Sequence, residues 1–397
     1  MKLGYKATLI ASFTGYVVQA ITINFSPLLY LTFQTTYDLS IPQISSLIAV
    51  CFAIQMITDA LAAKFADKLH PRATAISAHL LAAIGIGGFG FFPDIMPPYV
   101  GLLVAILLSG MGSGLVEVMI SPIVEACPTK HKSAAMSLLH SFYCWGQASV
   151  ALFSTLFFAV AGIDNWRILS LLWAIIPLWN AILFVFVPIT LPPSGKDSTG
   201  RSFFKNKIFW ILIAVMLCAG ASEMAMSQWA SSFAESALGI SKTVGDLLGP
   251  CMFAVLMGCA RVFYAKFSTK ISLRKFMIAS GGLCIVSYLL AALAPHPIVA
   301  LIGCALCGLS VGIMWPGGLS MAAGRLPLGG VSMFAFLALA GDLGCLSGPT
   351  AVGHLSALFD GNIRSALLTA IIFPLLLILS LLKLPKRQAP NEVKTKM

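Results

Sequence analysis

Long uncharged segments recur along the whole chain. No Asp, Glu, Lys or Arg occurs in residues 7–37, 73–93, 133–163 or 365–382. About 20 predominantly apolar residues are enough to cross a bilayer as an α-helix. A closed β-barrel would instead need alternating strands of about ten residues, which these continuous apolar runs do not provide. The pattern therefore predicts an all-α membrane protein.

The boundaries between the apolar runs predict twelve spans. The longest uncharged run, 276–324, is divided at Ala294-Pro295-His296-Pro297, a sequence typical of a turn. A short basic segment precedes the first span, as in a signal peptide. The apolar run is long and has no small-residue cleavage site, however, so we expect it to be retained as a helix. The predicted spans are 7–33, 42–64, 72–92, 98–124, 133–161, 165–190, 207–233, 244–266, 272–293, 297–322, 329–358 and 363–384.

Composition and charge agree with a membrane-spanning protein, and the positions of the charges also predict its orientation in the membrane. Only 10% of residues are charged, whereas soluble domains have about 25%. If both termini are cytoplasmic, all Lys and Arg residues except Arg167, Lys242 and Arg364 fall on the cytoplasmic side, as the positive-inside rule requires. The sequence thus predicts a multi-pass protein of the cell membrane with both termini in the cytoplasm. The net charge of +11 needs no nucleic-acid partner to explain it.

An internal repeat divides the chain into two halves. Residues 63–72 read AKFADKLHPR and residues 265–274 read AKFSTKISLR, a similar pattern displaced by 202 positions. We expect a six-helix half over 1–190, a cytoplasmic linker over 191–207, a second six-helix half over 208–384, and a cytoplasmic tail over 385–397. Transporters built from such repeats move one half against the other around a central site.

Other motifs are better explained by packing than by catalysis. The ten cysteines, Cys304 and Cys307 of a CxxC among them, are scattered through apolar spans and are expected to behave as small buried hydrophobes. Residues 85–90 match GxGxxG and residues 308–312 match GxSxG, but neither follows the strand that such a motif needs. The sequence therefore predicts no enzyme activity, no cofactor and no metal site.

Several segments carry a resemblance to a known family. The loop 63–72 resembles the loop GxLADRxGRR between helices 2 and 3 of the major facilitator superfamily, with Asp67, Lys68 and Arg72 at its charged places and Ala63 and His70 in place of two glycines. Within that superfamily, the chain is most similar to the fucose permease group of sugar transporters. The segments that carry this similarity are 117–122 in helix 4, 138–146 in helix 5, Glu223 with Trp229 in helix 7, and 313–316 in helix 10.

The resemblance implies the major facilitator fold and secondary active transport of a small solute. One position departs from the pattern of the fucose permease group. That group has a second acid in helix 1, and the position that aligns with it here is Pro27. A proton carried by Glu117 would therefore move without that partner, or together with Glu223 across the cavity.

Charged side chains within the spans are the candidates for transport chemistry. An ionisable residue at the membrane centre costs roughly 2.5–3.5 kcal/mol on insertion scales, so it tends to be functional. We expect Glu117 and Glu223 to take part in proton coupling, although a glutamic acid that hydrogen bonds between helices is the structural alternative. Asp342 is less clear, because it precedes Gly344, Gly348-Pro349 and Gly353 in a span whose glycines suggest a bend.

A second group of side chains is expected to bind substrate. His140 stands where the resemblance implies a sugar-binding Gln, and imidazole both donates and accepts hydrogen bonds; a histidine that only packs near the inner end of helix 5 is the structural alternative. Tryptophan rings stack on sugars but are also frequent at membrane interfaces, so both roles stay open for them. The expected substrate-binding residues are Asn24, His140, Trp145, Trp229 and Trp315.

Asp59 and Arg261 suggest a gate, because they are also separated by 202 positions. Under the twofold pseudosymmetry they would meet across the cytoplasmic end of the cavity, and their ion pair would favour the outward-open state. The alternative is that charges pair within each half, for example Asp67 with a basic residue of its own loop.

Three classes of function remain, and transport is favoured. The first is a secondary transporter that couples a hydrophilic solute, for which we favour a sugar, to H+ or Na+. A drug exporter of the same superfamily is the alternative, but helix 5 contains only Gly146 where an exporter would have a glycine-rich stretch. A membrane enzyme or receptor has no supporting cluster. We expect a monomer whose partners are its small-molecule substrate, the coupling ion and membrane lipid.

Overall fold

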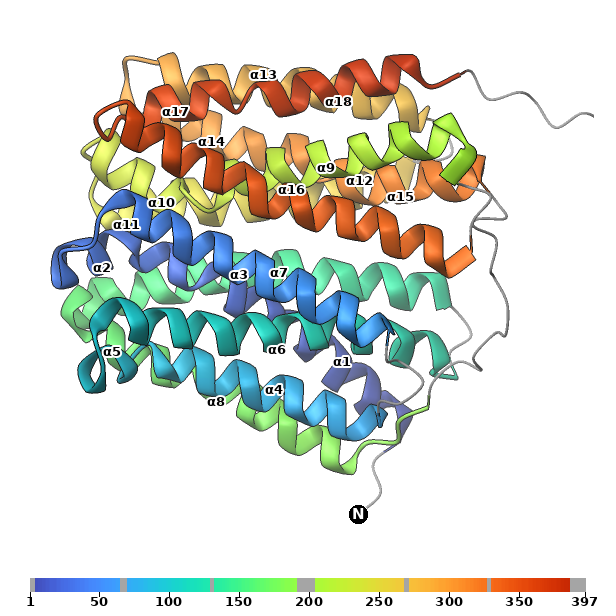
Figure 1. Ribbon diagram of the computed structural model, residues 1–397, viewed down its shortest axis with the longest axis horizontal. Helices are drawn as coiled ribbons and strands as arrows, with labels where there is room; N and C mark the ends of the chain where they lie inside the picture. Colours follow the sequence, from blue (N-terminus) through green and yellow to red (C-terminus); the bar gives the residue numbers. More distant parts are fainter. Residues whose placement is uncertain are drawn as a thin grey trace, which may run out of the picture.

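The computed structural model describes residues 4–64, 70–128, 132–190, 204–267, 271–326 and 330–385. Within these ranges the regular structure is helical (Figure 1). Asp67 and Lys68 of the expected charged loop lie outside the described residues, as does most of the expected linker. The elements are α1 (Tyr5–Asn24), η1 (Ser26–Leu29), α2 (Tyr30–Tyr37), α3 (Ile41–Lys64), α4 (Pro71–Gly88), α5 (Phe92–Ile95), α6 (Pro98–Ala126), α7 (Lys132–Ala161), η3 (Ile163–Asn165), α8 (Trp166–Phe186), α9 (Lys207–Ser227), α10 (Ala230–Ser232), η5 (Phe233–Ala237), α11 (Lys242–Asp246), η6 (Leu247–Cys251), α12 (Met252–Phe267), α13 (Leu273–Leu293), α14 (Pro297–Val311), α15 (Met314–Arg325), α16 (Gly330–Leu358), α17 (Ile363–Thr369) and α18 (Ile372–Lys383).

The membrane-spanning character of the chain is confirmed. Eleven helical segments among the described residues are long and apolar enough to cross a bilayer. The expected third span, α4, is not among the eleven, because it combines Arg72 and His79 with many small residues. It nevertheless packs along its length against α6 and α8, as a further helix of the same bundle.

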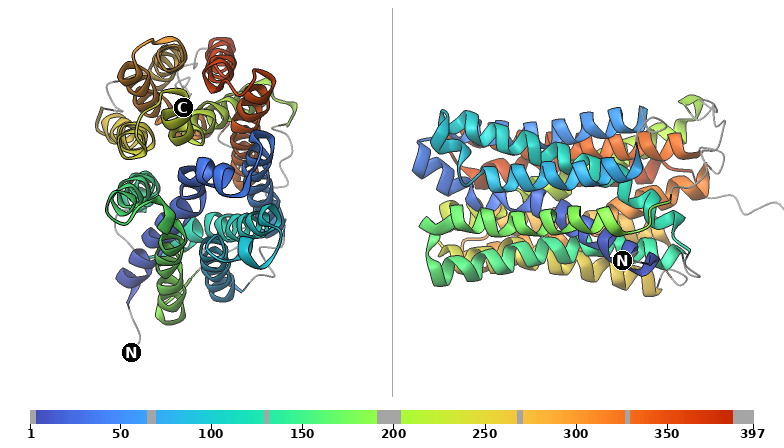
Figure 2. Two further views of the ribbon diagram at one scale, coloured as in Figure 1. Left: turned by 90° about the vertical axis from the view of Figure 1, so that its left-hand side faces the viewer. Right: turned by 90° about the horizontal axis from the view of Figure 1, so that it is seen from below.

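The helices form two groups that lie side by side. Elements α1 to α8, here called the N-half, occupy the lower part of Figure 1, and α9 to α18, here called the C-half, occupy the upper part. A view along the helices shows the two groups end-on (Figure 2). Residues near the two ends of the chain lie at the same end of the bundle, which we call the terminal end. The opposite end, which carries α2, α5, α11 and α17, is the distal end (Figure 1).

Arg72 and Arg274 occupy equivalent positions in the two halves, and each binds the end of a helix in its own half. Arg72 at the start of α4 donates from Nη1 to the carbonyl groups of Phe184 and Val185, each at 2.6 Å. Arg274, exactly one repeat of 202 later in the sequence pattern, donates to the carbonyl groups of Leu381 and Leu382 at 3.0 and 2.9 Å. The last carbonyls of a helix have no partner within it. Each arginine therefore satisfies the end of the last long helix of its own half.

Two spans are interrupted where they face the other half. The first span breaks after α1, and Pro27 lies in the short η1 segment that precedes α2. The seventh span is interrupted further along, because α9 continues through Gly220 to Ser227 and the turn follows there. Gly220 is instead a contact point, because a Cβ atom on it would lie 2.2 Å from the Gly341 carbonyl oxygen of α16.

Glycines in the spans bring helices together. A Cβ atom on Gly344 of α16 would lie 2.0 Å from the Leu217 carbonyl oxygen of α9, and α16 itself runs uninterrupted from Gly330 to Leu358. Glycines also bring α6 close to its neighbours: a Cβ atom on Gly112 would lie 2.6 Å from the Ala82 nitrogen of α4, and one on Gly114 would lie 2.9 Å from the Gln55 carbonyl oxygen of α3. The start of α6 at Pro98 is as predicted, and the helix ends at Ala126, two residues beyond the prediction.

Candidate functional site

A cavity lies between the two halves and is the candidate site for a transported solute. It contains about 680 Å³ of empty space when the part that is open to the outside is counted. The N-half contributes Tyr16, Gln19, Ile23, Phe52, Gln55, Glu117, His140 and Tyr143, and the C-half contributes Glu223, Met224, Arg261, Trp315, Asp342 and Cys345.

Glu117 is held at the cavity wall by two amide side chains. Its Oε2 atom accepts hydrogen bonds from Nε2 of Gln19 at 2.8 Å and from Nε2 of Gln55 at 2.9 Å. Gln55 is fixed in turn, because its Oε1 atom accepts a hydrogen bond from the Ser113 hydroxyl at 3.0 Å. Three helices, α1, α3 and α6, therefore meet at one carboxyl oxygen. The second oxygen, Oε1, has no hydrogen-bond partner among the described residues and belongs to a side chain that lines the cavity.

Glu223 faces Glu117 from the C-half, although the two differ in their surroundings. Glu223 is 6% exposed and lines the cavity, yet its carboxylate makes no hydrogen bond within the described part of the chain. Its charged neighbour is Arg261, with which it interacts electrostatically. The cavity thus contains one glutamate anchored by amides and another whose hydrogen-bonding capacity is free for a solute, a water molecule or a proton.

Arg261 joins the two halves through backbone carbonyl groups. Its Nε atom donates to the Gly312 carbonyl at 3.1 Å within the C-half, and its Nη1 atom reaches the His140 carbonyl of the N-half at 3.5 Å. No ion pair joins Arg261 to Asp59 in the described residues, so the expected gate pair is not formed in this conformation. The guanidinium group instead donates to these two carbonyl groups.

Asp59 and Asp342 add two carboxyl groups beside the cavity. Asp342 is 7% exposed and lines the cavity. Asp59 interacts electrostatically with Glu117 and with Asp342, and its buried Oδ1 atom makes no hydrogen bond to a described residue. These carboxyl groups come from both halves, because α3 packs against α16. The described residues contain no group of three or more His, Cys, Asp or Glu side chains arranged to hold a metal ion.

His140 lies in the cavity wall among hydroxyl groups. Its ring meets the ring of Tyr16 edge-on, with centroids 5.3 Å apart, and the Tyr16 hydroxyl shares a hydrogen bond of 2.9 Å with Ser121. Asn24 is buried outside the lining, but its Nδ2 atom donates to the Tyr143 hydroxyl at 3.4 Å. Of these expected substrate-binding residues, His140 therefore reaches the cavity directly and Asn24 only through Tyr143.

The three expected tryptophans occupy different environments. Trp315 lines the cavity, where its ring packs over Gly341. Trp229 is 2% exposed and lies outside the lining, with Nε1 donating to the Pro349 carbonyl at 2.9 Å and its ring near Tyr30 of the N-half. Trp145 is 42% exposed and also lies outside the lining, against Gly258 at the seam between α7 and α12. Only Trp315 is thus placed to stack on a solute in this cavity.

Four neutral polar residues that surround Glu117 and His140 are not among the site residues expected from the sequence. Gln19, Gln55, Tyr16 and Tyr143 all line the cavity. A signal for them was present, because amide groups in an uncharged membrane span need a partner. These side chains carry neither a charge nor a recognisable motif, so nothing else distinguishes them in the sequence.

Hydrogen bonds between the halves are concentrated on the distal side of the cavity. The Tyr30 hydroxyl donates to Oε1 of Gln228 at 3.2 Å, Ser45 donates to the Thr350 carbonyl at 3.2 Å, and Lys242 donates to the Leu28 carbonyl. On the terminal side, the side-chain hydrogen bond between the halves among the described residues is the one from Arg261 to His140. The distal end is therefore the more firmly closed of the two.

Comparison with family models gives one match that extends over the chain. The model described as Major Facilitator Superfamily matches residues 8–327 and 237–397. No curated protein sequence matches the chain.

Solved structures show the same fold at low sequence identity. A bacterial homologue of the human lysosomal transporter Spinster, inward-facing and unoccupied, has a TM-score of 0.79 and 14% identity, with 97% of this chain and 98% of that chain covered. The nucleoside transporter NupG, as a variant, has a TM-score of 0.76 and 13% identity over 95% and 98% of the two chains. The fucose:proton symporter of E. coli, also as a variant, has a TM-score of 0.64 and 17% identity over 94% and 97%.

Proposed function

Because this chain belongs to the Major Facilitator Superfamily, we propose that it is a secondary active transporter that moves a small hydrophilic solute across the membrane by alternating access. The observation that carries the proposal is the cavity between the halves, which takes polar side chains from both of them. A solute bound there contacts both halves at once. Its binding energy therefore depends on how the halves are arranged, which is the requirement for coupling binding to movement.

We favour a sugar or a similar polyol as the solute. The cavity offers amide, hydroxyl and imidazole groups from Gln19, Tyr143 and His140, which can donate to and accept from hydroxyl groups. Trp315 supplies an aromatic face, on which the apolar face of a sugar ring can stack. The fucose:proton symporter among the similar structures supports this solute class, although the nucleoside transporter is the more similar in fold.

Coupling to protons is assigned to Glu117 and Glu223. Glu223 has no hydrogen-bond partner among the described residues, so a proton or a solute hydroxyl would satisfy it. Glu117 has one oxygen anchored by Gln19 and Gln55 and the other available. Sodium remains the alternative coupling ion, and a sodium gradient in the transport assay distinguishes it.

The terminal end is proposed to face the cytoplasm, as the distribution of Lys and Arg favours. The firmly closed distal end then makes this an inward-facing conformation. In the opposite conformation, with the terminal end closed, we propose that Asp59 and Arg261 approach each other as a cytoplasmic gate. Swapping their charges should restore transport that each single substitution removes; a swap that restores nothing contradicts the gate.

The test is uptake by proteoliposomes of sugars first ranked by thermal shift of the purified protein. We expect uptake to accelerate under an inward proton gradient, and Glu117→Gln and Glu223→Gln to abolish that acceleration. Asp94→Asn is the matched control, because Asp94 pairs with Arg167 on the distal surface, outside the cavity. Proton flux that is independent of sugar, or flux driven only by apolar drugs, would contradict the proposal and favour an efflux antiporter.

A further inference from the structure

The break in the first span leaves backbone carbonyl groups at the boundary between the halves. In an unbroken helix, the Ile23 carbonyl would accept a hydrogen bond from the N–H of residue 27. Residue 27 is proline, which has no N–H, so this carbonyl needs another partner. Leu28, in the short η1 segment that follows, presents a second carbonyl group to the C-half.

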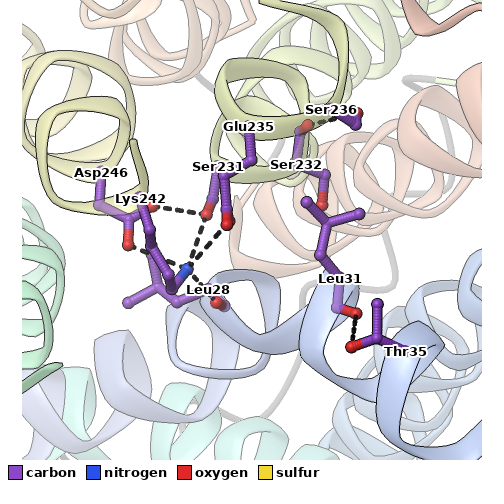
Figure 3. A network of polar contacts seen from close by, with 9 residues as sticks. All are labelled: Leu28, Leu31, Thr35, Ser231, Ser232, Glu235, Ser236, Lys242 and Asp246. Atoms are coloured by element: carbon purple, nitrogen blue, oxygen red, sulfur yellow. Dashed lines mark hydrogen bonds and ion pairs between the residues drawn. The ribbon is translucent and has the colours of Figure 1, made fainter. Parts of the chain in front are cut away.

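Side chains of the C-half bind both of these carbonyl groups. Gln228, at the turn after α9, donates from Nε2 to the Ile23 carbonyl at 3.4 Å and accepts from the Tyr30 hydroxyl at 3.2 Å. Lys242, at the start of α11, donates from Nζ to the Leu28 carbonyl at 2.5 Å (Figure 3). The broken segment 23–30 is thus held at both of its ends by the opposite half.

The Lys242 ammonium group has strong partners within its own half. It lies 3.1 Å from Oδ2 of Asp246 and 3.6 Å from Oε2 of Glu235, and Ser231 joins the cluster by donating to Oδ1 of Asp246 (Figure 3). Asp246 is fully buried, whereas the side chain of Lys242 is 15% exposed. From the N-half, the ammonium group also meets the ring of Phe158 at 5.7 Å.

This division of partners suits a contact that opens and closes. Both carboxylates that neutralise Lys242 belong to the C-half, whereas the N-half provides only a neutral carbonyl group and an aromatic ring. Separation of the halves therefore leaves no unpaired buried charge, which is the costly outcome when an ion pair is split. When Lys242 moves away, water can donate a hydrogen bond to the Leu28 carbonyl group in its place.

We propose that the broken segment 23–30 is the distal gate of the transporter and that Lys242, with Gln228, is the latch that holds it closed. This inference rests on the proposed alternating access. It also explains why a proline is tolerated in the first span where the fucose permease group has an acid: Pro27 releases a carbonyl group that the other half uses for closure.

Distance measurement between spin labels tests the latch without knowledge of the solute. Nine of the ten cysteines are buried, so Cys259→Ser removes the exposed one and leaves a suitable background. Labels at Thr35→Cys and Ser236→Cys report on the distal end, because both residues are exposed and lie near the latch in opposite halves (Figure 3). Labels at Ala73→Cys and Lys275→Cys, a second exposed pair, report on the terminal end.

In this background we expect Lys242→Met to raise the ratio of distal-open to distal-closed molecules by about tenfold, equivalent to about 1.4 kcal/mol. The double variant Lys242→Met/Asp246→Asn, which leaves no unpaired acid at residue 246, and Gln228→Leu should act in the same direction. Arg167→Met is the matched control: Arg167 is also a distal cation bound to an acid, but its contacts with Asp94, Tyr37 and Trp166 all lie within its own half, whereas Lys242 also binds the opposite half. It should leave the distances unchanged.

Distal distances that stay the same in Lys242→Met, in the double variant and in Gln228→Leu would overturn the latch, as would equal opening in Arg167→Met. The terminal pair tests the underlying function separately. If the distal end opens while the terminal distance never shortens in any variant, the latch is supported and alternating access is not.

Discussion

The close approach of α9 and α16 yields a prediction whose size follows from the geometry. Gly344 lies in α16 against α9, and a Cβ atom there would be 2.0 Å from the Leu217 carbonyl oxygen and 2.8 Å from the Ala221 nitrogen. Ordinary contacts of a Cβ atom begin at 3.4 Å. The atoms that it meets belong to backbone, which cannot rotate away as a side chain can. Gly344→Ala must therefore push the two helices apart by more than 1 Å, on the order of the shortfall between these distances.

The expected cost is that of overpacking, about 1–3 kcal/mol of stability. Gly282 provides the matched control, because it also lies inside a helix, α13, but has no atom within 4 Å of its would-be Cβ. Gly282→Ala should instead stabilise the protein by about 0.5–1 kcal/mol, since alanine loses less backbone entropy in a helix. The two substitutions thus have the same chemistry and opposite expected signs.

The measurement is the thermal unfolding midpoint of each purified variant in the same detergent. We expect the midpoint of Gly344→Ala to fall and that of Gly282→Ala to rise or stay level. A midpoint for Gly344→Ala at or above that of Gly282→Ala would refute the packing of α9 on α16. Because these helices carry Glu223 and Asp342 into the cavity, Gly344→Ala should also weaken the stabilisation of the protein by its solute.

Three further substitutions test other features. Arg274→Met should lower the unfolding midpoint, because it removes two hydrogen bonds from a charged donor, worth about 1.5–3 kcal/mol each; an unchanged midpoint would show that water replaces them. Asn180→Leu should cost about 1–3 kcal/mol by removing the partner of the buried His79 Nε2 atom and a hydrogen bond to the Ala11 carbonyl group, which the same measurement checks against the unaltered protein. Trp315→Leu should reduce solute-induced thermal stabilisation more than Trp145→Leu does, and the reverse order would place the binding site outside the cavity.

The spans and the duplication could be predicted from the sequence because their cause is local. A bilayer imposes a length on every apolar run, and two copies of one loop pattern remain visible at a fixed separation. The breaks within spans were harder to locate. Glycine weakens a helix, yet Gly220 packs closely against Gly341 inside an intact α9, and the turn comes only after Ser227.

The candidate site was predictable in part for a similar reason. A carboxylate in a membrane span is conspicuous, and both Glu117 and Glu223 do line the cavity. The direction in which a tryptophan points depends on the packing of neighbouring helices, so nothing in the sequence separated Trp315 from Trp229. The pairing of Asp59 with Arg261 was inferred from symmetry alone, and the arginine has nearer partners in this conformation.

The two equivalent arginines, Arg72 and Arg274, affect how the protein tolerates mutation. Each binds carbonyl groups of its own half, and the two share no partner. Losses at sites without shared partners add. The double variant should therefore lose the sum of the two single losses, and neither copy can compensate for the other. Duplication in this protein has therefore produced two sites at which a substitution lowers stability, and neither site protects the protein against loss of the other.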